Sequence, residues 1–367
     1  MKQELIKNLL DVLNEYHSLG IADQIDYKKF YLYSLITHST AIEGSTVTEI
    51  ENQLLFDEGI TAKGRSLQEQ MMNLDLKAAY EQSMRWARKH EDFSVEMLKK
   101  LSALVMKNTG ASYNTAQGSF DASKGDLRLV GVTAGIGGRS YMNYQKVPAK
   151  LEELCKLLNQ RRSELSNLDD TIAKYQLSFD AHYQLVTIHP WVDGNGRMSR
   201  LVMNHLQYEF GLVPVKIVKE DKAEYIQALI DSREQESLEP FREFMMEEHI
   251  RNISTEIEEY KKSQDVDFID FCHESDIQES LTTHITPPVD PIKVPSDLIN
   301  AFSDPIKARL YQAIQRNGTL NYAEYAAIVG VSEATVKRRL SELKREGAII
   351  RVGSNKTGYW KVKRKFI

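Results

Sequence analysis

Two helical patterns flank one twelve-residue string, which reads His-Pro-Trp-Val-Asp-Gly-Asn-Gly-Arg-Met-Ser-Arg over positions 189–200. Upstream, apolar side chains recur at steps of three and four over 172–186, as in an amphipathic helix. Pro190 ends that helix, because the residue before a proline is steered away from helical angles. The same period returns over 198–210, where a glycine and a proline follow as a stop. We therefore expect a loop between two helices, with residues 194–197 at the start of the second.

The residue types in this loop suit a substrate that contains phosphate. The start of a helix presents unpaired N–H groups and a partial positive charge, and glycines let an anion approach the backbone. Arg197 and Arg200 lie three apart on one helical surface, where they can bind two phosphate groups or one group from two sides. Asp193 can hold a Mg²⁺ ion that bridges phosphate oxygens, and His189 can accept a proton from an attacking hydroxyl. The string predicts transfer from a nucleotide to a hydroxyl, with phosphorylation and nucleotidyl transfer equally open.

The string resembles the signature of the Fic family, His-Pro-Phe-x-Asp/Glu-Gly-Asn-Gly-Arg-x-x-Arg, with Trp191 in place of the phenylalanine. Since that ring packs inward in the family, we expect altered packing and intact chemistry. The resemblance implies a mainly α fold, a Fic-type helical bundle with a β-hairpin flap. It also implies a protein adenylyltransferase that moves AMP from ATP to a Ser, Thr or Tyr hydroxyl of a protein target or of the chain itself. It makes His189 the catalytic base and Asp193 the metal ligand, and it assigns these residues to ATP: Gly194, Asn195, Gly196, Arg197, Arg200 and Tyr225.

Other donors and another class of function stay open. Relatives that phosphorylate carry a lysine where this chain has Gly196, which disfavours phosphorylation, whereas relatives that transfer phosphocholine share much of the string. The alternative class is a DNA-binding regulator whose Fic core senses a nucleotide or is silent. The intact His189 argues against that alternative, because a pure sensor does not need the base.

A second resemblance lies over residues 125–148, which look like the family's flap. The flap is a hairpin that lies over the active site and registers the target chain by strand addition. A Gly-Ile-Gly-Gly run inside it is interpreted as the hairpin tip, because no Gly-Lys-Ser/Thr follows to make a phosphate loop. The residues expected to dock the target are Val130, Thr133, Gly135 and Gly138. Hydroxyl side chains in or near this region are candidate self-modification sites: Tyr113, Ser140, Tyr141 and Tyr144.

A third resemblance covers residues 39–44, Ser-Thr-Ala-Ile-Glu-Gly, which match the family's inhibitory motif Ser/Thr-x-x-x-Glu-Gly/Asn. Ser39 and Glu43 are its defining residues here. In the family the glutamate pairs with the second arginine of the catalytic string, which would be Arg200, and so competes with the γ phosphate of ATP. An arginine–carboxylate fork is directional, and partial burial strengthens it above its surface value. We expect a self-restrained enzyme in which Glu43 also has a candidate role in removing the transferred group.

Composition sets the frame for these motifs. Hydrophobic residues make up 42% of the 367 positions and charged residues 27%, as in a globular protein. The two cysteines lack companion ligands at zinc spacing, so neither a disulfide framework nor a metal cluster is supported. The absence of a long apolar span and of a secretory leader favours the cytoplasm and argues against a membrane partner. We expect an N-terminal helical region with the inhibitory motif (1–90), a catalytic core (91–258), a linker or arm (259–300) and a winged helix domain (301–367).

The C-terminal region differs from the rest in charge. Residues 301–367 carry a net charge of +9, which leaves −14 for residues 1–300 of a chain whose net charge is −5. Three helices are expected over 306–315, 322–329 and 332–346, and a hairpin over 349–362, which is the pattern of a winged helix-turn-helix. Lys337, Arg338 and Arg339 are expected to face outward on the third helix, where DNA is one candidate partner and another protein, including a second copy in a homodimer, is the other.

Overall fold

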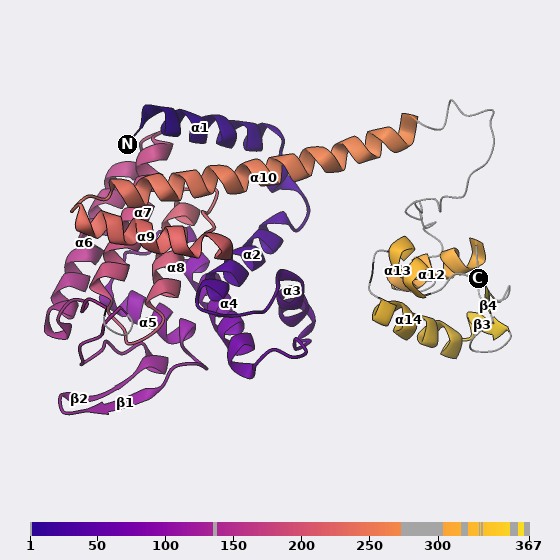
Figure 1. Cartoon of the computed structure of the whole chain (residues 1–367), viewed down its shortest axis with the longest axis horizontal. Helices are drawn as coiled ribbons and strands as arrows, with labels where there is room; N and C mark the ends of the chain where they lie inside the picture. Colours follow the sequence, from indigo (N-terminus) through magenta and orange to yellow (C-terminus); the bar gives the residue numbers. More distant parts are fainter. Residues whose placement is uncertain are drawn as a thin grey trace. The chain divides into compact units, whose positions relative to one another are not determined.

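The computed structural model describes residues 2–134, 138–272, 304–316, 322–329, 331, 333–352 and 359–362. Two compact units divide the chain, Met1–Ser275 and Asp276–Ile367. The first unit is a helical bundle with one small hairpin (Figure 1). Its helices and strands are α1 (Gln3–Ser18), α2 (Tyr27–Ile42), α3 (Glu49–Glu58), α4 (Leu67–Arg88), α5 (Val95–Val105), β1 (Ser112–Thr115), β2 (Gly118–Asp121), α6 (Val147–Ser166), α7 (Thr171–Ile188), α8 (Asn195–Glu209), α9 (Lys222–Glu234) and α10 (Glu239–Cys272). Short 3-10 turns occupy Ile21–Asp23, Ala122–Lys124, Tyr144–Lys146 and Lys219–Asp221.

Helix α8 lies at the centre of this bundle and carries the second half of the catalytic string. From Gly194 to Gln207 every residue is buried except Gly196, so the helix is enclosed on nearly all sides. Two apolar clusters cover it, one around Leu201 and Leu206 and the other around Met203. Burial of this kind fixes the direction of each side chain on α8, because a close-packed interior leaves few alternative rotamers.

The predicted mainly α fold is confirmed. The helices expected around the catalytic string are α7 and α8. The pattern did not predict α3, nor the antiparallel pair β1–β2. In the expected flap, the described residues form an isolated antiparallel bridge between Thr133 and Ser140, with a backbone hydrogen bond from Tyr141 to Val132 beside it.

Residues 259–272, where the sequence predicted the start of a linker, are the last part of helix α10, which runs to Cys272 beside α1 (Figure 1). The buried apolar residues of α10, up to Ile257, pack into the second cluster, which holds the first part of the helix against the bundle. The expected N-terminal region and core lie together in the first compact unit. The rest of the expected linker, residues 273–300, lies outside the described residues.

The second unit has the expected helices and hairpin. They are α12 (Pro305–Arg316), α13 (Tyr322–Val329), α14 (Glu333–Arg345), β3 (Ile349–Val352) and β4 (Tyr359–Val362). The strands pair antiparallel, with Ile349 opposite Val362. A small apolar core joins the three helices to the hairpin, and it includes Tyr325, Leu340 and Trp360.

Among the described residues, no helix has the length and apolar character needed to cross a lipid bilayer.

Candidate active site

The backbone of the catalytic string makes two sharp changes of direction. Helix α7 ends at His189, whose φ of 52° is left-handed, a conformation that costs a residue with a side chain about 1–2 kcal/mol. Gly194 then precedes α8 with a φ of 81°, and a Cβ at this position would lie 2.8 Å from the sulfur of Met106. Only glycine fits there without displacing a neighbour. The loop therefore stores strain at its histidine and needs its glycine, as is common at functional sites.

Side chains inside the loop hold its shape. Asn195 accepts a hydrogen bond from the backbone N–H of Trp191 (3.1 Å) and donates one to its carbonyl (2.9 Å). The Trp191 indole is buried and donates from Nε1 to the carbonyl of Gly125 at 3.1 Å. The tryptophan thus finds the hydrogen-bond partner that a buried indole needs and a phenylalanine does not. The side-chain amide of Asn195, expected to contact ATP, is bonded to the Trp191 backbone within the loop.

His189 lies at the entrance of α8 with one ring nitrogen engaged. Its Nδ1 faces the carbonyl of Val186 at 3.3 Å, and a proton on Nδ1 leaves Nε2 as the acceptor. The pKa of His189 is lowered to about 4, mainly by burial and to a smaller extent by the nearby Arg128 charge. The hydrogen bond to the Val186 carbonyl and the charges of Asp193 and Glu43 act in the opposite direction. The imidazole is therefore neutral at pH 7 and is able to take a proton.

Arg200 is held by the end of α2. Its Nε donates to the hydroxyl of Ser39 (2.8 Å), and its Nη2 donates to the Ser39 carbonyl (2.9 Å) and to Glu43 Oε1 (2.5 Å). Its Nη1 is buried without a hydrogen-bond partner. The contact between Glu43 and Arg200 that the motif implied is present. Burial would raise the pKa of Glu43, but the Arg200 charge and hydrogen bond, with the charges of Arg197 and Lys222, lower it below its ordinary value. The carboxylate therefore stays ionised.

The Glu43 carboxylate occupies the start of α8. A Cβ added at Gly196 would lie 2.5 Å from Glu43 Oε1 and 3.2 Å from Arg200 Nη1. The first N–H groups of a helix have no acceptor within the helix, and they favour an anion. An anionic group of the protein thus lies where the sequence predicted a phosphate group, against the glycine that leaves room for it.

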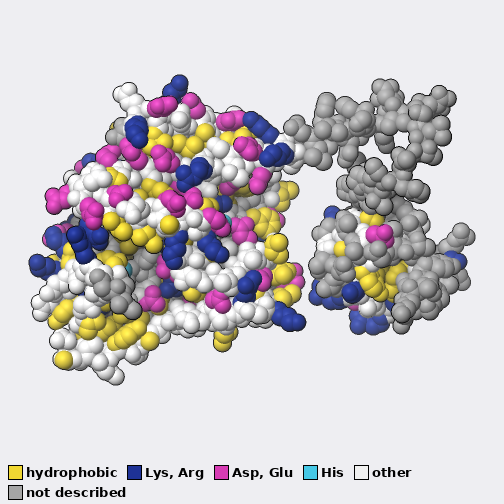
Figure 2. Space-filling model, in the orientation of Figure 1, with side chains coloured by type: hydrophobic (Ala, Val, Ile, Leu, Met, Phe, Trp, Pro, Cys, Tyr) yellow, Lys and Arg dark blue, Asp and Glu magenta, His cyan; other side chains and the backbone are white. Residues whose placement is uncertain are grey.

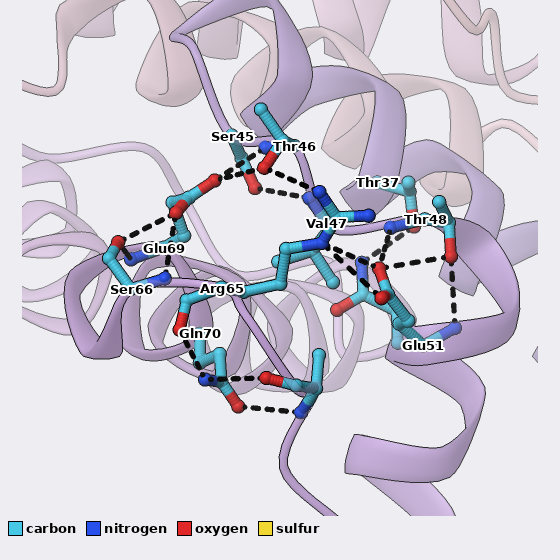
Figure 3. A network of polar contacts seen from close by, with 12 residues as sticks. Thr37, Ser45, Thr46, Val47, Thr48, Glu51, Arg65, Ser66, Glu69 and Gln70 are labelled. Carbon is cyan, nitrogen blue, oxygen red and sulfur yellow. Dashed lines mark hydrogen bonds and ion pairs between the residues drawn. The ribbon is translucent and has the colours of Figure 1, made fainter.

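A polar network fixes the turn that follows Glu43 (Figure 3). Helices α3 and α4 both begin with capping boxes, Thr48 with Glu51 and Ser66 with Glu69. Glu69 also accepts hydrogen bonds from the backbone N–H and the hydroxyl of Thr46, both at 2.7 Å. Each of these glutamates accepts a hydrogen bond from an otherwise unpaired backbone N–H at the start of its helix. Glu69 also holds the turn that follows Glu43 through its bonds to Thr46.

Arg65 and the buried amides complete this network. Arg65 joins Glu51 to Thr46, donating to them at 3.1 and 3.0 Å (Figure 3). Beneath it, Asn73 accepts from Thr40 (2.7 Å) and Asn52 (2.9 Å). The last turn of α2 is thus hydrogen-bonded to both α3 and α4. These contacts fix the position of Glu43 beside Arg200.

The other arginine and the acidic residue of the string also lie at the start of α8. Arg197 is buried, with Nη1 3.4 Å from the Val105 carbonyl, and its Nε has no hydrogen-bond partner. Asp193 is largely exposed, with Oδ1 2.6 Å from the N–H of Gly194 and 3.6 Å from Arg197 Nη2. Among the described residues, no group of three or more His, Cys, Asp or Glu side chains could hold a metal ion. Asp193 is thus one accessible carboxylate beside an anion site, which fits Mg²⁺, since this ion takes one or two carboxylates together with phosphate oxygens and water.

Tyr225, which the resemblance places near ATP, lies next to Arg200 at the edge of the second apolar cluster. It is buried, its hydroxyl is 3.0 Å from His182 Nε2, and its ring lies within 6.3 Å of the Phe241 ring. Its hydroxyl also interacts with Arg200, and the Glu43 charge acts on it, so the side chain borders the site as well as the core. The expected role of Tyr225 in ATP binding stays a prediction.

Arg128 has a position that the sequence did not predict. Its side chain is 1% exposed and donates to three carbonyls, those of His189 (2.7 Å), Val130 (2.7 Å) and Met142 (2.5 Å). Its backbone N–H donates to Pro190. In the sequence, the Gly-Asp-Leu-Arg stretch marks the start of the flap. The hydrogen bonds of its arginine could not be predicted, because backbone carbonyls are the same at every residue.

The expected docking residues lie on the flap that Arg128 holds. Val130 contacts Arg128 through its carbonyl, and Thr133 forms the bridge with Ser140. At Gly138 a Cβ would lie 1.9 Å from the carbonyl of Ala134, so this turn requires a glycine. Gly135 lies outside the described residues.

Comparison with known proteins gives two matching families. Residues 92–207 match the sequence model of the Fic/DOC family, and residues 303–350 match that of a winged helix-turn-helix DNA-binding domain. The protein adenylyltransferase fic-1 of Caenorhabditis briggsae is 24% identical over 233 residues, 62% of this chain and 42% of that protein. The protein adenylyltransferase Fic of Drosophila grimshawi is 28% identical over 240 residues, 64% of this chain and 44% of that protein. The chain thus spans less than half the length of these curated relatives.

Solved structures agree on the fold. A Fic domain-containing signaling protein from Bacteroides thetaiotaomicron superposes with a TM-score of 0.57 at 21% identity, over 70% of this chain and 98% of that one. A Fic family protein from Desulfovibrio desulfuricans superposes with a TM-score of 0.55 at 18% identity, over all of this chain and 98% of that one.

Proposed function

The chain carries a Fic domain followed by a winged helix-turn-helix domain, and on this premise we propose that it is a protein adenylyltransferase restrained by its own Glu43. One observation carries the proposal. A carboxylate lies on Arg200 at the start of α8, beside Gly196, and a neutral histidine ends the helix before it. The site is built to hold an anion next to a base, which is the arrangement that transfer from a nucleotide to a hydroxyl needs.

The reaction uses each group of the string in turn. The phosphate groups of ATP bind at the N–H groups that begin α8 and at Arg197 and Arg200. A hydroxyl of the target, registered along the flap, attacks the α phosphorus while His189 Nε2 takes its proton. The bond between the α phosphorus and the bridging oxygen breaks, pyrophosphate leaves and AMP stays on the target. Mg²⁺ held by Asp193 would neutralise charge on the phosphate oxygens.

Glu43 sets the limit on this reaction. While its carboxylate holds Arg200, a phosphate group must either displace it or bind elsewhere, so ATP adopts a pose unsuited to attack. The side chain of Glu43 is 34% exposed, so the same carboxylate is in reach of water. We extend the proposal to the reverse reaction, in which Glu43 orients water for removal of AMP.

The test follows the α phosphate. With Mg²⁺ and ATP labelled at the α phosphate, the Glu43→Gly variant is expected to retain label on protein, whereas label at the γ phosphate should leave with pyrophosphate. Intact mass should show one or more additions of AMP. Retention of the γ label would contradict the proposal in favour of phosphorylation, and binding of ATP without any retained label would favour a nucleotide-sensing regulator or another donor.

DNA is the proposed partner of the second unit. Exposed basic side chains lie on α14, at Lys337, Arg338, Lys344 and Arg345, and Figure 2 shows basic side chains gathered along the lower edge of this unit. Arg339, expected to face outward with them, is instead paired with Asp304 (3.1 Å) and Glu342 (2.9 Å). The basic surface is therefore smaller than the sequence predicted, yet it still lies on the helix expected to enter the major groove.

The salt dependence of binding tests this partner. With about four phosphate contacts, affinity for a short duplex should fall roughly 100-fold between 50 and 200 mM salt. An Arg338→Ala/Lys344→Ala variant should bind more weakly with a shallower slope in a gel-shift titration. Lys307→Ala is the matched control, because Lys307 is already paired with Glu342 and Glu346. No binding at low salt, or a slope near zero, would favour a protein partner for the winged helix.

A further inference from the structure

The flap places an aromatic ring directly on the catalytic histidine. The rings of Tyr141 and His189 are stacked, with centroids 3.7 Å apart and planes 15° from parallel. A ring at this distance leaves no room for water on that face of the imidazole, and it does not cover the ring edge that carries the nitrogens. Because Nδ1 faces Val186, the nitrogen left at that edge for an incoming hydroxyl is Nε2.

Arg128 holds together the two backbone segments that carry the stacked rings. It donates to the carbonyl of His189 on one side and to the carbonyl of Met142, the residue after Tyr141, on the other. The backbone N–H of Tyr141 also donates to the carbonyl of Val132 at 3.0 Å, which joins the two sides of the flap. The backbone segments that carry the two rings are thus bound to one buried guanidinium.

We propose that Tyr141 is a positioning residue for the general base: its ring holds the imidazole of His189 with Nε2 toward the acceptor hydroxyl, and Arg128 holds the flap where this stack forms. The inference rests on the proposed function for the reaction in which His189 takes part. The stack of Tyr141 on His189 and the hydrogen bonds of Arg128, here called the clamp, can be tested without measuring that reaction.

The surroundings of His189 indicate what loss of the ring should do. Three charged groups act on the imidazole: Arg128 favours its neutral form, and Asp193 and Glu43 favour its charged form. Burial, to which the Tyr141 ring contributes by covering one face, is the largest influence and favours the neutral form. Water admitted in place of the ring should therefore raise the pKa of His189 from about 4 toward its ordinary value of 6.5.

The experiment compares three variants in the Glu43→Gly background. Tyr141→Ala removes the ring, Tyr141→Phe keeps it without the hydroxyl, and Phe30→Ala removes an exposed aromatic ring on α2, outside the flap, as a control. The pKa of His189 is followed by NMR on protein with ¹³C-labelled histidine, assigned by loss of its signal in His189→Ala. The rate of AMP transfer to the chain itself is measured against ATP concentration and pH.

Tyr141→Ala is expected to raise the pKa of His189, to move the acid limb of the rate profile up with it, and to lower kcat about tenfold with KM for ATP unchanged. Tyr141→Phe should recover both properties, and Phe30→Ala should leave both as they are. A faster reaction in Tyr141→Ala would overturn the proposal, because the ring would then be a lid. Equal losses in Tyr141→Ala and Tyr141→Phe would overturn it in favour of the hydroxyl.

Arg128→Lys separates the clamp from the charge. Lysine keeps the positive charge but lacks the fork that reaches three carbonyls, so the pKa of His189 and kcat should fall between those of the parent and of Tyr141→Ala. Thermal unfolding of each variant shows whether it is folded. If no variant retains label, the proposed function fails while the NMR titration still decides the stack; an unchanged pKa in Tyr141→Ala refutes the inference in either case.

Discussion

Replacing Glu43 by glycine is expected to raise the rate of AMP transfer roughly 10- to 100-fold. A hydrogen bond to a charged group contributes about 1.5–3 kcal/mol, and about 1.4 kcal/mol corresponds to a factor of ten in rate. In this chain the bond joins a buried arginine to a carboxylate at 2.5 Å, and the carboxylate also lies at the helix start where phosphate should bind. Its loss should free both Arg200 and the N–H groups of α8.

Two further variants, Glu43→Gln and a control at an exposed acid, test whether the charge of Glu43 causes this effect. Glutamine keeps the size of the side chain but loses its charge, so it should release the restraint partly and slow any reverse reaction. Glu58→Gln is the matched control, since Glu58 is exposed on α3. Initial rates with labelled ATP give the comparison. Equal rates in wild type and Glu43→Gly would show that the ion pair is structural and does not restrain the enzyme.

In the activated protein, His189→Ala is expected to lower transfer about 10²- to 10⁴-fold, the usual contribution of a general base. ATP affinity, measured by calorimetry, should hardly change, because the phosphate groups bind to the arginines and the helix start. The pKa of His189 is lowered to about 4, so the base form is present above that pH and is lost below it. The rate should therefore be flat between about pH 5.5 and 8 and fall on the acid side.

Control measurements test whether the loss of transfer in His189→Ala is due to loss of the general base. His17→Ala removes an exposed histidine far from the string and should keep the activated rate. A His189→Ala variant that retains full activity would assign proton transfer to another group. An acid limb near pH 6.5 in the parent would mean that the imidazole is more solvated than its environment in the structure implies.

The helices and the catalytic string could be predicted from the sequence because their signals are local. Apolar spacing of three and four gave α7, α8 and the three helices of the second unit, and glycine and proline gave their ends. Helix α3 was missed because its buried face is short, with Asn52 and Leu55 as its only buried residues. The strands β1 and β2 have four residues each, too few for an alternating pattern to stand out.

The parts of the site that the sequence missed depend on tertiary contacts. The hydrogen bond of Arg128 to the His189 carbonyl and the stack of Tyr141 on His189 join segments 61 and 48 residues apart through partners that have no sequence signature. Asn195 shows the converse, since it has the residue type expected of a binding group while its side-chain amide is bonded within the loop. The contact of Glu43 with Arg200 was foreseen only through the resemblance.

The bare α-carbon of Gly196 has a consequence for how such chains can diverge. A Cβ at this position would lie 2.5 Å from Glu43 Oε1, so a side chain at 196 requires the end of the Glu43 carboxylate to move. A substitution at 196 should therefore disturb the ion pair between Glu43 and Arg200 without any change at 43. Among chains of this architecture, residues 43 and 196 should vary as a linked pair.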